Sequence, residues 1–458
     1  MKIGDTVVHP KWGRGVILAV EKRARGTFVK VKLGYAIDWF PVSELPGGET
    51  IAVPAPATTL KSGAPTHPPV PAGEAQRIAS ARSAVQALKL GQALEAQVER
   101  ISVGTAEHEE AFAQAFRKAE GSKPQLIMVE GAWGVGKTHL LTLLSAHASK
   151  RRFAVSTTIL DGWAASISDP MRLLESIAGS IRFPGQAVPM GIGTMLSTVK
   201  RRGMVELRAW AGPRMVQLME QLPQEALDDP EVIAVLEDYL GLTLPASQAR
   251  DQLSRLGWRG VALPALKAKS VDERGQRLAE LLCDWAAFCV AGGAKGLLVV
   301  LDEVDVDYAR APWWDTPRRT KQDYTLQALG ALQRQDVPLV VAFGSAPAGP
   351  GEDDSVDAVR DVIKKLGHVD AHERAVTLSE GHLIELADKV HDLYADAYPE
   401  FANKLSADQL RSITNMLLRA HRRQLSPVPR RFVRSLLHCL DLVDLGQATP
   451  ASLLNAGR

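Results

Sequence analysis

The chain has 458 residues, a formal net charge of +2, 46% hydrophobic residues and 23% charged residues. This composition is typical of a globular protein with a large core, and the balanced charge neither indicates nor excludes nucleic-acid binding. The cysteines, Cys283, Cys289 and Cys439, form no CxxC pair, which argues against a disulfide framework or a zinc site. No apolar run of about 18 residues and no signal-peptide start is found, so we expect a cytoplasmic protein without a membrane segment.

Residues 1–45 are expected to form a small β-barrel, because they contain several short strand patterns, and residues 27–33 alternate with a period of two. The segment resembles modules of the CarD family and of the C-terminus of UvrD-type helicases through Gly4-Asp5-x-Val7-x-His9-Pro10 and Gly13-x-Gly15-x-Ile17. This resemblance implies an SH3-like or Tudor-like barrel that contacts RNA polymerase or other proteins. Basic residues outnumber acidic ones here, so the barrel has either a phosphate-binding face or an ordinary solvated one.

The remaining chain divides by composition and periodicity. Residues 46–75 are rich in proline, glycine, alanine and threonine, which favours an extended linker over a packed domain. Apolar side chains at helical spacing follow. We expect a core over residues 76–378 and a helical lid domain over residues 379–458. Residues 162–290 show no convincing strand and are expected to be a helical insertion in the core.

The strongest motif is Gly131-x-x-x-x-Gly136-Lys137-Thr138, which stands between an apolar run and an apolar helix start. Strand, glycine-rich loop and helix are the context that a P-loop requires. The glycines let backbone N–H groups turn toward phosphate oxygens, and the helix adds the positive end of its dipole. Lys137 is expected to reach the β- and γ-phosphates, and Thr138 to bind Mg²⁺. The residues expected to contact ATP are Gly131, Ala132, Trp133, Gly134, Val135, Gly136, Lys137, Thr138 and His139.

A second motif follows the insertion. The apolar run 296–301 precedes Asp302 and Glu303, which predicts a strand buried on both faces that ends in two acids. Asp302 is expected to hold the Mg²⁺ shell with Thr138, and Glu303 to orient or deprotonate the attacking water. Together with the P-loop, this pair predicts ATP hydrolysis. We expect the acids that come next, Asp305 and Asp307, to be solvated.

Two basic segments leave DNA as a candidate ligand. Trp313 and Trp314 stand shortly before Arg318 and Arg319, an arrangement that either stacks on bases and binds phosphates or packs onto the insertion. The cluster 200–202, Lys-Arg-Arg, favours a solvated helix face over a nucleic-acid contact.

The last third of the chain adds two candidate site residues. The apolar run 338–344 predicts another buried strand, whose end places Ser345 beside the γ-phosphate in P-loop sheets of this order. A final strand is predicted at residues 374–378, and helices follow. Pro429-Arg430 opens the last of these helices, from which Arg430 is expected to reach back to the nucleotide phosphates.

The order of P-loop, acidic strand, small polar strand end and helical lid resembles that of an AAA+ ATPase, an α/β fold with a parallel sheet. More narrowly, residues 78–445 resemble the BrxD-type ATP-binding proteins of BREX phage-defence systems, distant relatives of origin-recognition AAA+ proteins. This resemblance implies that Ser345 is the first sensor and Arg430, or its neighbour Arg431, the second. It also implies an arginine finger from a neighbouring subunit, and therefore a homo-oligomer. The segments that carry it are Ala84–Gly91, Gly131–Leu141, Phe153–Asp161, Leu298–Glu303 and Pro429–Arg434.

From these motifs and the resemblance we expect an ATPase, with ATP and Mg²⁺ as cofactors, in a DNA-associated antiviral defence complex. Its nucleotide state would drive assembly or remodelling with a helicase, methyltransferase or nuclease of the defence system. One alternative is a nucleotide-dependent switch or scaffold that recruits partners through the N-terminal barrel with little turnover. Another is a transcription-linked regulator that contacts RNA polymerase. Glu303 favours hydrolysis over the switch.

Overall fold

The computed structural model describes two units, Met1–Val70 and Pro71–Arg458, each of which is treated by itself. The described residues are 6–9, 13–23, 26–33, 36–41, 72–161, 165–186, 189, 192–266, 268, 270–309, 316–347, 358–375, 377–422 and 429–456. Trp313 and Trp314 lie outside these ranges, so the two interpretations of that segment both remain predictions. Among the described residues, no helix combines the length and the apolar character that crossing a membrane requires.

The N-terminal unit contains an antiparallel sheet in the order β1-β2-β3-β4. Its register shifts between Ile17 and Ala19, which marks an irregularity such as a β-bulge in the second strand. The sheet agrees with the expected short strands, whereas closure into an SH3-like or Tudor-like barrel stays a prediction. The strands are β1 (Thr6–His9), β2 (Gly13–Arg23), β3 (Gly26–Leu33) and β4 (Ala36–Pro41).

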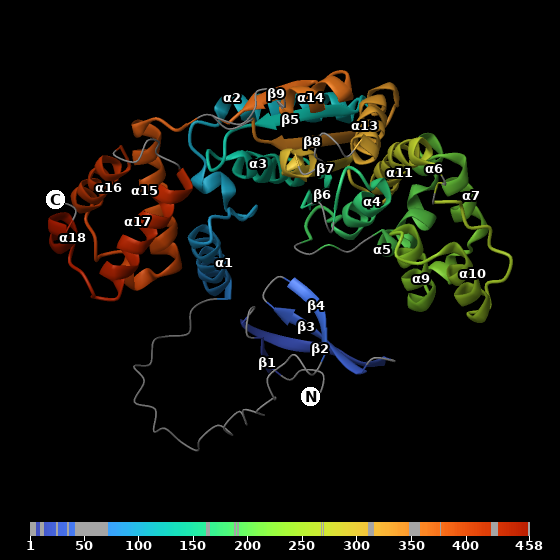
Figure 1. The fold of residues 1–458 in the computed structure, drawn as a ribbon, viewed down its shortest axis with the longest axis horizontal. Helices are drawn as coiled ribbons and strands as arrows, with labels where there is room; N and C mark the ends of the chain where they lie inside the picture. The colour runs from blue at the N-terminus through green and yellow to red at the C-terminus, as the bar shows by residue number, and fades with distance from the viewer. Residues whose placement is uncertain are drawn as a thin grey trace, which may run out of the picture. The chain divides into compact units, whose positions relative to one another are not determined.

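The second unit is built around a five-stranded parallel sheet in the order β6-β7-β8-β5-β9 (Figure 1). Because all five strands are parallel, their carboxyl ends meet at one edge, where ligands bind in open α/β sheets. The α/β class and the parallel sheet are as predicted. The strands are β5 (Gln125–Glu130), β6 (Ala154–Ile159), β7 (Leu297–Asp302), β8 (Leu339–Ser345) and β9 (Ala371–Arg374).

The predicted position of the last strand is wrong by a few residues. Residues 374–378 were expected to form it, but β9 ends at Arg374. Its pairing with β5 runs from Ala371 to Arg374, and Leu378 packs instead against the core of the C-terminal helices. Leu378, one of the apolar residues that suggested a strand, therefore belongs to a different core.

Side chains of the sheet alternate between two cores. Leu126 and Met128 of β5 face one core, whereas Ile127 and Val129 face the other. The second of these cores is covered by α2 (Ala106–Glu120) and α3 (Lys137–Lys150). The first is covered by α4 (Pro170–Gly179), α11 (Val271–Ala291), α13 (Thr316–Gly330) and α14 (Ala358–Leu366). Burial on both faces explains why β5, β7 and β8 are continuous apolar runs.

The insertion between β6 and β7 is helical, as predicted. Within its described parts (165–186, 192–266 and 270–290), no strand forms, and a single bridge joins Val155 to Arg182. A π-helical turn, Val199–Gly203, links α5 to α6. The helices that follow α4 are α5 (Gly193–Thr198), α6 (Met204–Trp210), α7 (Pro213–Gln221), α8 (Gln224–Leu227), α9 (Pro230–Leu240) and α10 (Ala246–Arg255).

The C-terminal helices form a separate apolar core together with the first helix, α1 (Ala72–Lys89). From the sequence, the first residues of α1 were expected to belong to the linker (46–75) and the others to the core (76–378). Its residues Ala84 and Val85 are buried with Leu386 and Leu436 instead. Any lid domain must therefore include α1 as well as residues 379–458. The C-terminal helices are α15 (Glu380–Ala397), α16 (Ala407–Arg422), α17 (Pro429–Asp444) and α18 (Pro450–Ala456).

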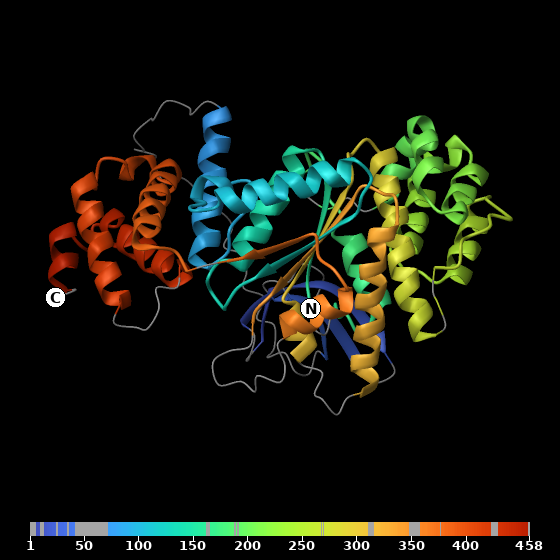
Figure 2. The same ribbon diagram turned by 90° about the horizontal axis from the view of Figure 1, so that it is seen from above.

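The helical groups lie on opposite sides of the sheet. Figures 1 and 2 both place the insertion helices (green) at one end of the sheet and the C-terminal helices (red), with α1 (blue), at the opposite end. The segment 98–105, which includes the short helix η2 (Val98–Ile101), connects α1 to α2 and lies against α3 and α15. The carboxyl edge of the sheet and the C-terminal helices therefore both border the site described next.

Candidate active site

The glycine-rich loop connects β5, which ends at Glu130, to α3, which begins at Lys137. Gly134 and Gly136 have φ angles of +82° and +121°, in the region that favours glycine. The loop thereby turns directly into a helix of 14 residues, and the first N–H groups of such a helix have no intrahelical partner. Free N–H groups and the helix dipole together suit this loop to bind phosphate oxygens.

The two predicted Mg²⁺ ligands lie in direct contact. Asp302 is the last residue of β7 and is only 4% exposed, and its Oδ2 accepts a hydrogen bond of 2.8 Å from Thr138 Oγ1. Its other oxygen accepts the backbone N–H of Glu303 at 2.9 Å. Residues 164 positions apart in the chain are thus brought together by the parallel sheet.

This pair suits Mg²⁺ because both donors are oxygens. No cluster of three or more histidine, cysteine or acidic side chains among the described residues is arranged to hold a metal alone. Mg²⁺ sites of nucleotide enzymes rarely need one, since water and substrate phosphates supply most ligands. The donor set of Thr138 and Asp302 therefore fits the expected cofactor.

Glu303 has a left-handed backbone conformation, with φ at +61°. This region is unfavourable for a residue with a Cβ atom and costs about 1 kcal/mol or more, and such residues cluster at active sites. Glu303 lines the same pocket as Lys137 and Asp302. The turn places the carboxylate beside the loop, rather than continuing the direction of β7.

Ser345 lies at the end of β8, between β5 and β7 in the sheet. It is completely buried, and its Oγ has no hydrogen-bond partner among the described residues. An unpaired buried hydroxyl is unfavourable, so a ligand or an ordered water is a natural partner. Ser345 does not itself line the pocket, in contrast to Lys137, Thr138, Asp302 and Glu303.

Gly344 leaves room for the acid beside it. A Cβ atom at this position would lie 2.3 Å from Asp302 Oδ1 and 2.6 Å from Leu141 Cδ1. Asp302 cannot withdraw without losing its bonds to Thr138 and to the Glu303 N–H. The absence of a side chain at Gly344 is therefore a requirement of the site.

Gly344→Ala should displace Asp302 and weaken both the fold and the Mg²⁺ site. Overpacking of this kind costs about 1–3 kcal/mol. We expect a lower midpoint of thermal unfolding and weaker binding of Mg-ATP by calorimetry. Gly179→Ala is the matched control, since a Cβ there meets no atom within 4 Å. Equal behaviour of the two variants would contradict the role of Gly344.

Arg430 approaches the site from the C-terminal helices. It lies in the first turn of α17, and a Cβ on Gly91 would come within 2.9 Å of Arg430 Cδ. It lines the same pocket as Lys137, and its expected reach to the nucleotide phosphates stays a prediction. The predicted loop residues Trp133, Gly134, Val135, Gly136 and His139 also line this pocket, whereas Gly131 and Ala132 do not.

The pocket has a polar end and an apolar end. The polar end contains Lys137, Thr138 and the acids after β7. The apolar end lies between the loop and the C-terminal helices and contains Leu88, Ile101, Val103, Leu386, Val390 and Val433. A phosphate chain suits the first end and a flat nucleobase the second, because small-molecule sites are mostly apolar with a few placed polar groups. Sequence reasoning did not find the apolar end, since its residues come from α1, the segment 98–105, α15 and α17.

Lys137 is half-buried, and its ammonium group lies 5.5 Å from the ring centroid of the exposed Trp133. Burial lowers the pKa of Lys137, and the negative charges of Asp305, Asp302 and Glu303 oppose this, with Asp305 the strongest. These carboxylates thus favour the charged ammonium that phosphate binding needs.

His139 connects the loop to the C-terminal helices. Its Nε2 lies 2.9 Å from Ser102 Oγ, and that hydroxyl donates to Val98 O, so Nε2–H is the donor to Ser102. Burial lowers the pKa of His139 to about 4, which keeps the ring neutral at neutral pH. Lys389 of α15 in turn donates to the Ser102 carbonyl at 2.6 Å. No motif in the sequence indicated Ser102, since its role depends on a contact between distant segments.

The expectation that Asp305 and Asp307 are solvated is wrong. Both belong to α12 (Val304–Ala309), the short helix after Glu303. Asp305 is half-buried, lines the pocket and accepts the N–H of Ala346 at 2.8 Å. Asp307 is completely buried. An acidic run after a strand is normally solvated, but here the helix turns its acids back toward the sheet.

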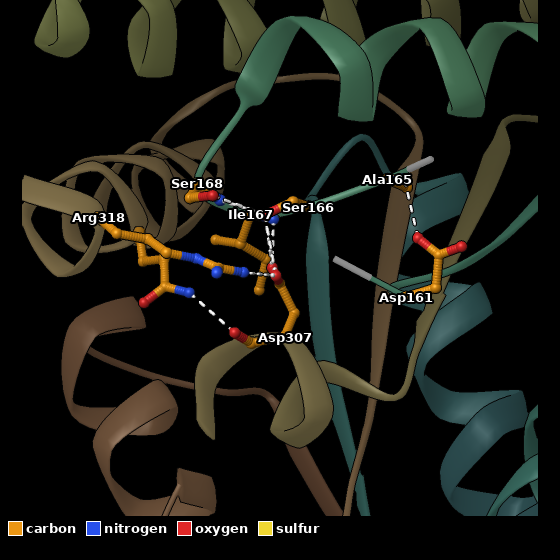
Figure 3. Close-up of polar contacts among 8 residues, drawn as sticks. Asp161, Ala165, Ser166, Ile167, Ser168, Asp307 and Arg318 are labelled. Carbon is orange, nitrogen blue, oxygen red and sulfur yellow. Dashed lines mark hydrogen bonds and ion pairs between the residues drawn. The ribbon is translucent and has the colours of Figure 1, made fainter. Parts of the chain in front are cut away.

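Asp307 is the centre of a polar network that joins three segments (Figure 3). Its carboxylate accepts Ser166 Oγ at 2.9 Å, the Ile167 N–H at 2.6 Å and Arg318 Nη2 at 3.1 Å. Gln322 donates to its backbone oxygen at 3.1 Å. The network fixes α12, and with it the turn at Glu303, to the start of the insertion and to α13. Arg318 is thereby engaged within the protein, as are Lys200 and Arg201 of the other basic cluster.

Comparison with known proteins agrees with the resemblance predicted above. Residues 77–168 match the family model described as BREX system ATP-binding protein BrxC/D. The resemblance to BREX ATP-binding proteins is confirmed over this segment. The matched segment runs from α1 through the glycine-rich loop to the residues that follow β6. No curated protein matches the chain.

Among solved structures, one match is a chain of the E. coli MS115-1 HORMA:CdnC:Trip13 complex, at 10% identity and a TM-score of 0.31, covering 70% of this chain and 76% of that one. A likeness at this TM-score carries no conclusion about function.

Proposed function

We propose that this chain is an ATPase of the AAA+ type that acts in a BREX-like phage-defence complex. The observation that carries the proposal is the hydrogen bond between Thr138 and Asp302, which joins the glycine-rich loop to the acidic strand end inside one pocket. The family match over residues 77–168 supports ATP binding and the link to defence. The five-stranded parallel sheet supports the P-loop core.

The arrangement suggests a division of roles. The N–H groups of residues 131–138 and the Lys137 ammonium bind the β- and γ-phosphates. Thr138 and Asp302 hold Mg²⁺, which neutralises charge on the phosphate oxygens when bound. Glu303 orients the attacking water and accepts its proton. Ser345 and Arg430 respond to the γ-phosphate, Ser345 from the sheet and Arg430 from α17, so that hydrolysis changes how the C-terminal helices sit on the pocket.

The wider role follows from the resemblance. We propose a homo-oligomer in the cytoplasm whose nucleotide state drives assembly or remodelling on DNA with a helicase, methyltransferase or nuclease of the defence system. The N-terminal unit then recruits a partner. The division into residues 1–45, 46–75, 76–378 and 379–458, with α1 added to the last, belongs to the same proposal.

Lys137→Ala should weaken ATP binding about tenfold or more, because charge-assisted hydrogen bonds to phosphate contribute about 1.5–3 kcal/mol each. Isothermal titration calorimetry of the full chain with Mg-ATP measures this effect. Lys123→Ala is the control, since Lys123 is exposed and does not line the pocket. Wild-type protein that binds no nucleotide, or a Lys137→Ala variant that binds as tightly, would contradict the proposed function.

A further inference from the structure

A hydrogen bond connects the polar end of the pocket to its apolar end. His139 stands in the first turn of α3, where the glycine-rich loop ends, and it lines the pocket. Its Nε2 lies 2.9 Å from the hydroxyl oxygen of Ser102, which belongs to the segment 98–105 between α1 and α2. The chain neighbours of Ser102, Ile101 and Val103, both line the apolar end. One bond thus ties the helix at the phosphate end to a segment that forms part of the other end.

Ser102 is buried, with only 6% of its surface exposed. Its hydroxyl group donates to Val98 O at 2.8 Å, so the same oxygen accepts the Nε2–H of His139. A buried donor that loses its acceptor is costly, because no water replaces it. Ser102 itself does not line the pocket, so it acts on a ligand through the residues beside it.

The same segment is held from its other side by α15. Lys389 of that helix donates to the backbone oxygen of Ser102 at 2.6 Å. Two residues further on, Gly104 has a φ angle of +64°, and a Cβ atom there would lie 2.9 Å from Cε1 of His382, also in α15. Ser102 is therefore fixed to α3 through its side chain and to α15 through its carbonyl group.

A nucleoside triphosphate has to reach both ends of the pocket at once. Its phosphate chain suits the glycine-rich loop and its base suits the apolar end, so the two ends must keep a fixed spacing. A site that is held in its binding geometry loses less conformational freedom when the ligand binds. Inorganic tripolyphosphate has no base and needs the polar end alone. The spacing of the two ends therefore affects these two ligands differently.

We propose that Ser102 is a positioning residue for the base: through its bond to His139 it sets the apolar end of the pocket at the correct distance from the glycine-rich loop. This inference rests on the proposed ATP-binding function. It makes the preference for a complete nucleotide over a bare triphosphate depend on a residue that touches neither the phosphates nor the base.

Ser102→Ala removes the acceptor of His139 with little change in side-chain size. Ser145→Ala is the matched control in α3. Ser145 is also buried, at 4% exposed, and its hydroxyl group donates to the oxygen of the residue four positions earlier, Leu141, at 3.0 Å. It does not line the pocket. The two variants therefore lose the same kind of bond to the backbone, and only Ser102→Ala also loses the bond to His139.

Lys389→Met tests the support from α15, because it removes the donor to the Ser102 carbonyl group and keeps a long apolar side chain. Lys404→Met is its control. Lys404 likewise donates to a backbone oxygen within the C-terminal helices, that of Asp444, at 2.9 Å, and it lies outside the pocket. The two lysine side chains are similarly exposed, at 33% and 37%.

The experiment is calorimetric titration of the full chain with a non-hydrolysable Mg-ATP analogue and with magnesium tripolyphosphate. We expect Ser102→Ala and Lys389→Met to bind the analogue about three- to tenfold more weakly than wild type, and tripolyphosphate with less than about a twofold change. Ser145→Ala and Lys404→Met should change neither affinity. Equal losses for both ligands, or no loss for the analogue, would overturn the inference.

A double substitution tests whether Ser102 acts through His139. In a His139→Phe background the bond is already absent, so adding Ser102→Ala should change the affinity for the analogue by less than about twofold. A second loss as large as the one in wild type would show that Ser102 acts independently of His139, which contradicts the inference. Wild-type protein that binds neither ligand would instead refute the proposed function itself.

Discussion

Glu303→Gln should reduce phosphate release by about a hundredfold or more while ATP remains bound, because general-base assistance contributes about 10²–10⁴ to such rates. Glutamine has nearly the same size and can adopt the same left-handed turn, so the pocket is retained. It cannot accept the proton of the attacking water. The measurement is the steady-state rate of phosphate release from Mg-ATP, with bound nucleotide identified by chromatography after rapid desalting.

A matched variant and two outcomes make the Glu303 prediction decisive. Glu225→Gln changes an exposed acid of α8 that does not line the pocket, and this variant should leave the rate of phosphate release unchanged. Phosphate release that survives Glu303→Gln would show that another group activates the water. ATP bound by wild type without any release would instead favour the nucleotide-dependent switch.

Asp307→Ala should destabilise the second unit by about 3 kcal/mol, the order of magnitude for breaking a buried charged network. The substitution removes the acceptor of the Ile167 N–H, an acceptor of the Ser166 hydroxyl and one partner of Arg318. The midpoint of urea unfolding, followed by circular dichroism, measures the loss. ATP turnover should fall as well, since the network fixes the helix that follows Glu303.

The control for Asp307 is an ion pair of the same type at the surface. Asp323 of α13 pairs with Lys365 at 2.5 Å, with side chains 28% and 31% exposed. Pairs exposed to this degree contribute about 0–1 kcal/mol, so Asp323→Ala should shift the midpoint little. If both variants had the same midpoint, the network around Asp307 would not be the structural support described above.

The α/β class and the parallel sheet were predicted from local patterns, and the structure confirms both. The P-loop and the acidic strand end could likewise be proposed from the sequence, because each lies within a few residues and its chemistry requires particular side chains at fixed spacing. Their contact through Thr138 and Asp302 follows from the rule that parallel strands end at one edge. The continuous apolar runs likewise predicted a sheet covered on both faces.

The predictions that failed depend on contacts between distant segments. The sequence predicts solvated acids after Glu303 because their partners, such as Ala346 and Ser166, lie far away along the chain. Helix α1 was assigned to the core because its apolar positions do not show which helices they contact. Similarly, residues 374–378 resemble a strand in sequence, but Leu378 packs against the core of the C-terminal helices. Periodicity identifies a buried face but not its partner.

The most direct test of the central claim is a structure of the chain with Mg²⁺ and a non-hydrolysable ATP analogue. We predict a triphosphate on the N–H groups of residues 131–138, with Mg²⁺ held by Thr138 and Asp302 and the base in the apolar end of the pocket. The Lys137 ammonium should then lie on the β- and γ-phosphates. A nucleotide bound elsewhere, or a pocket that stays empty at saturating analogue, would contradict the account.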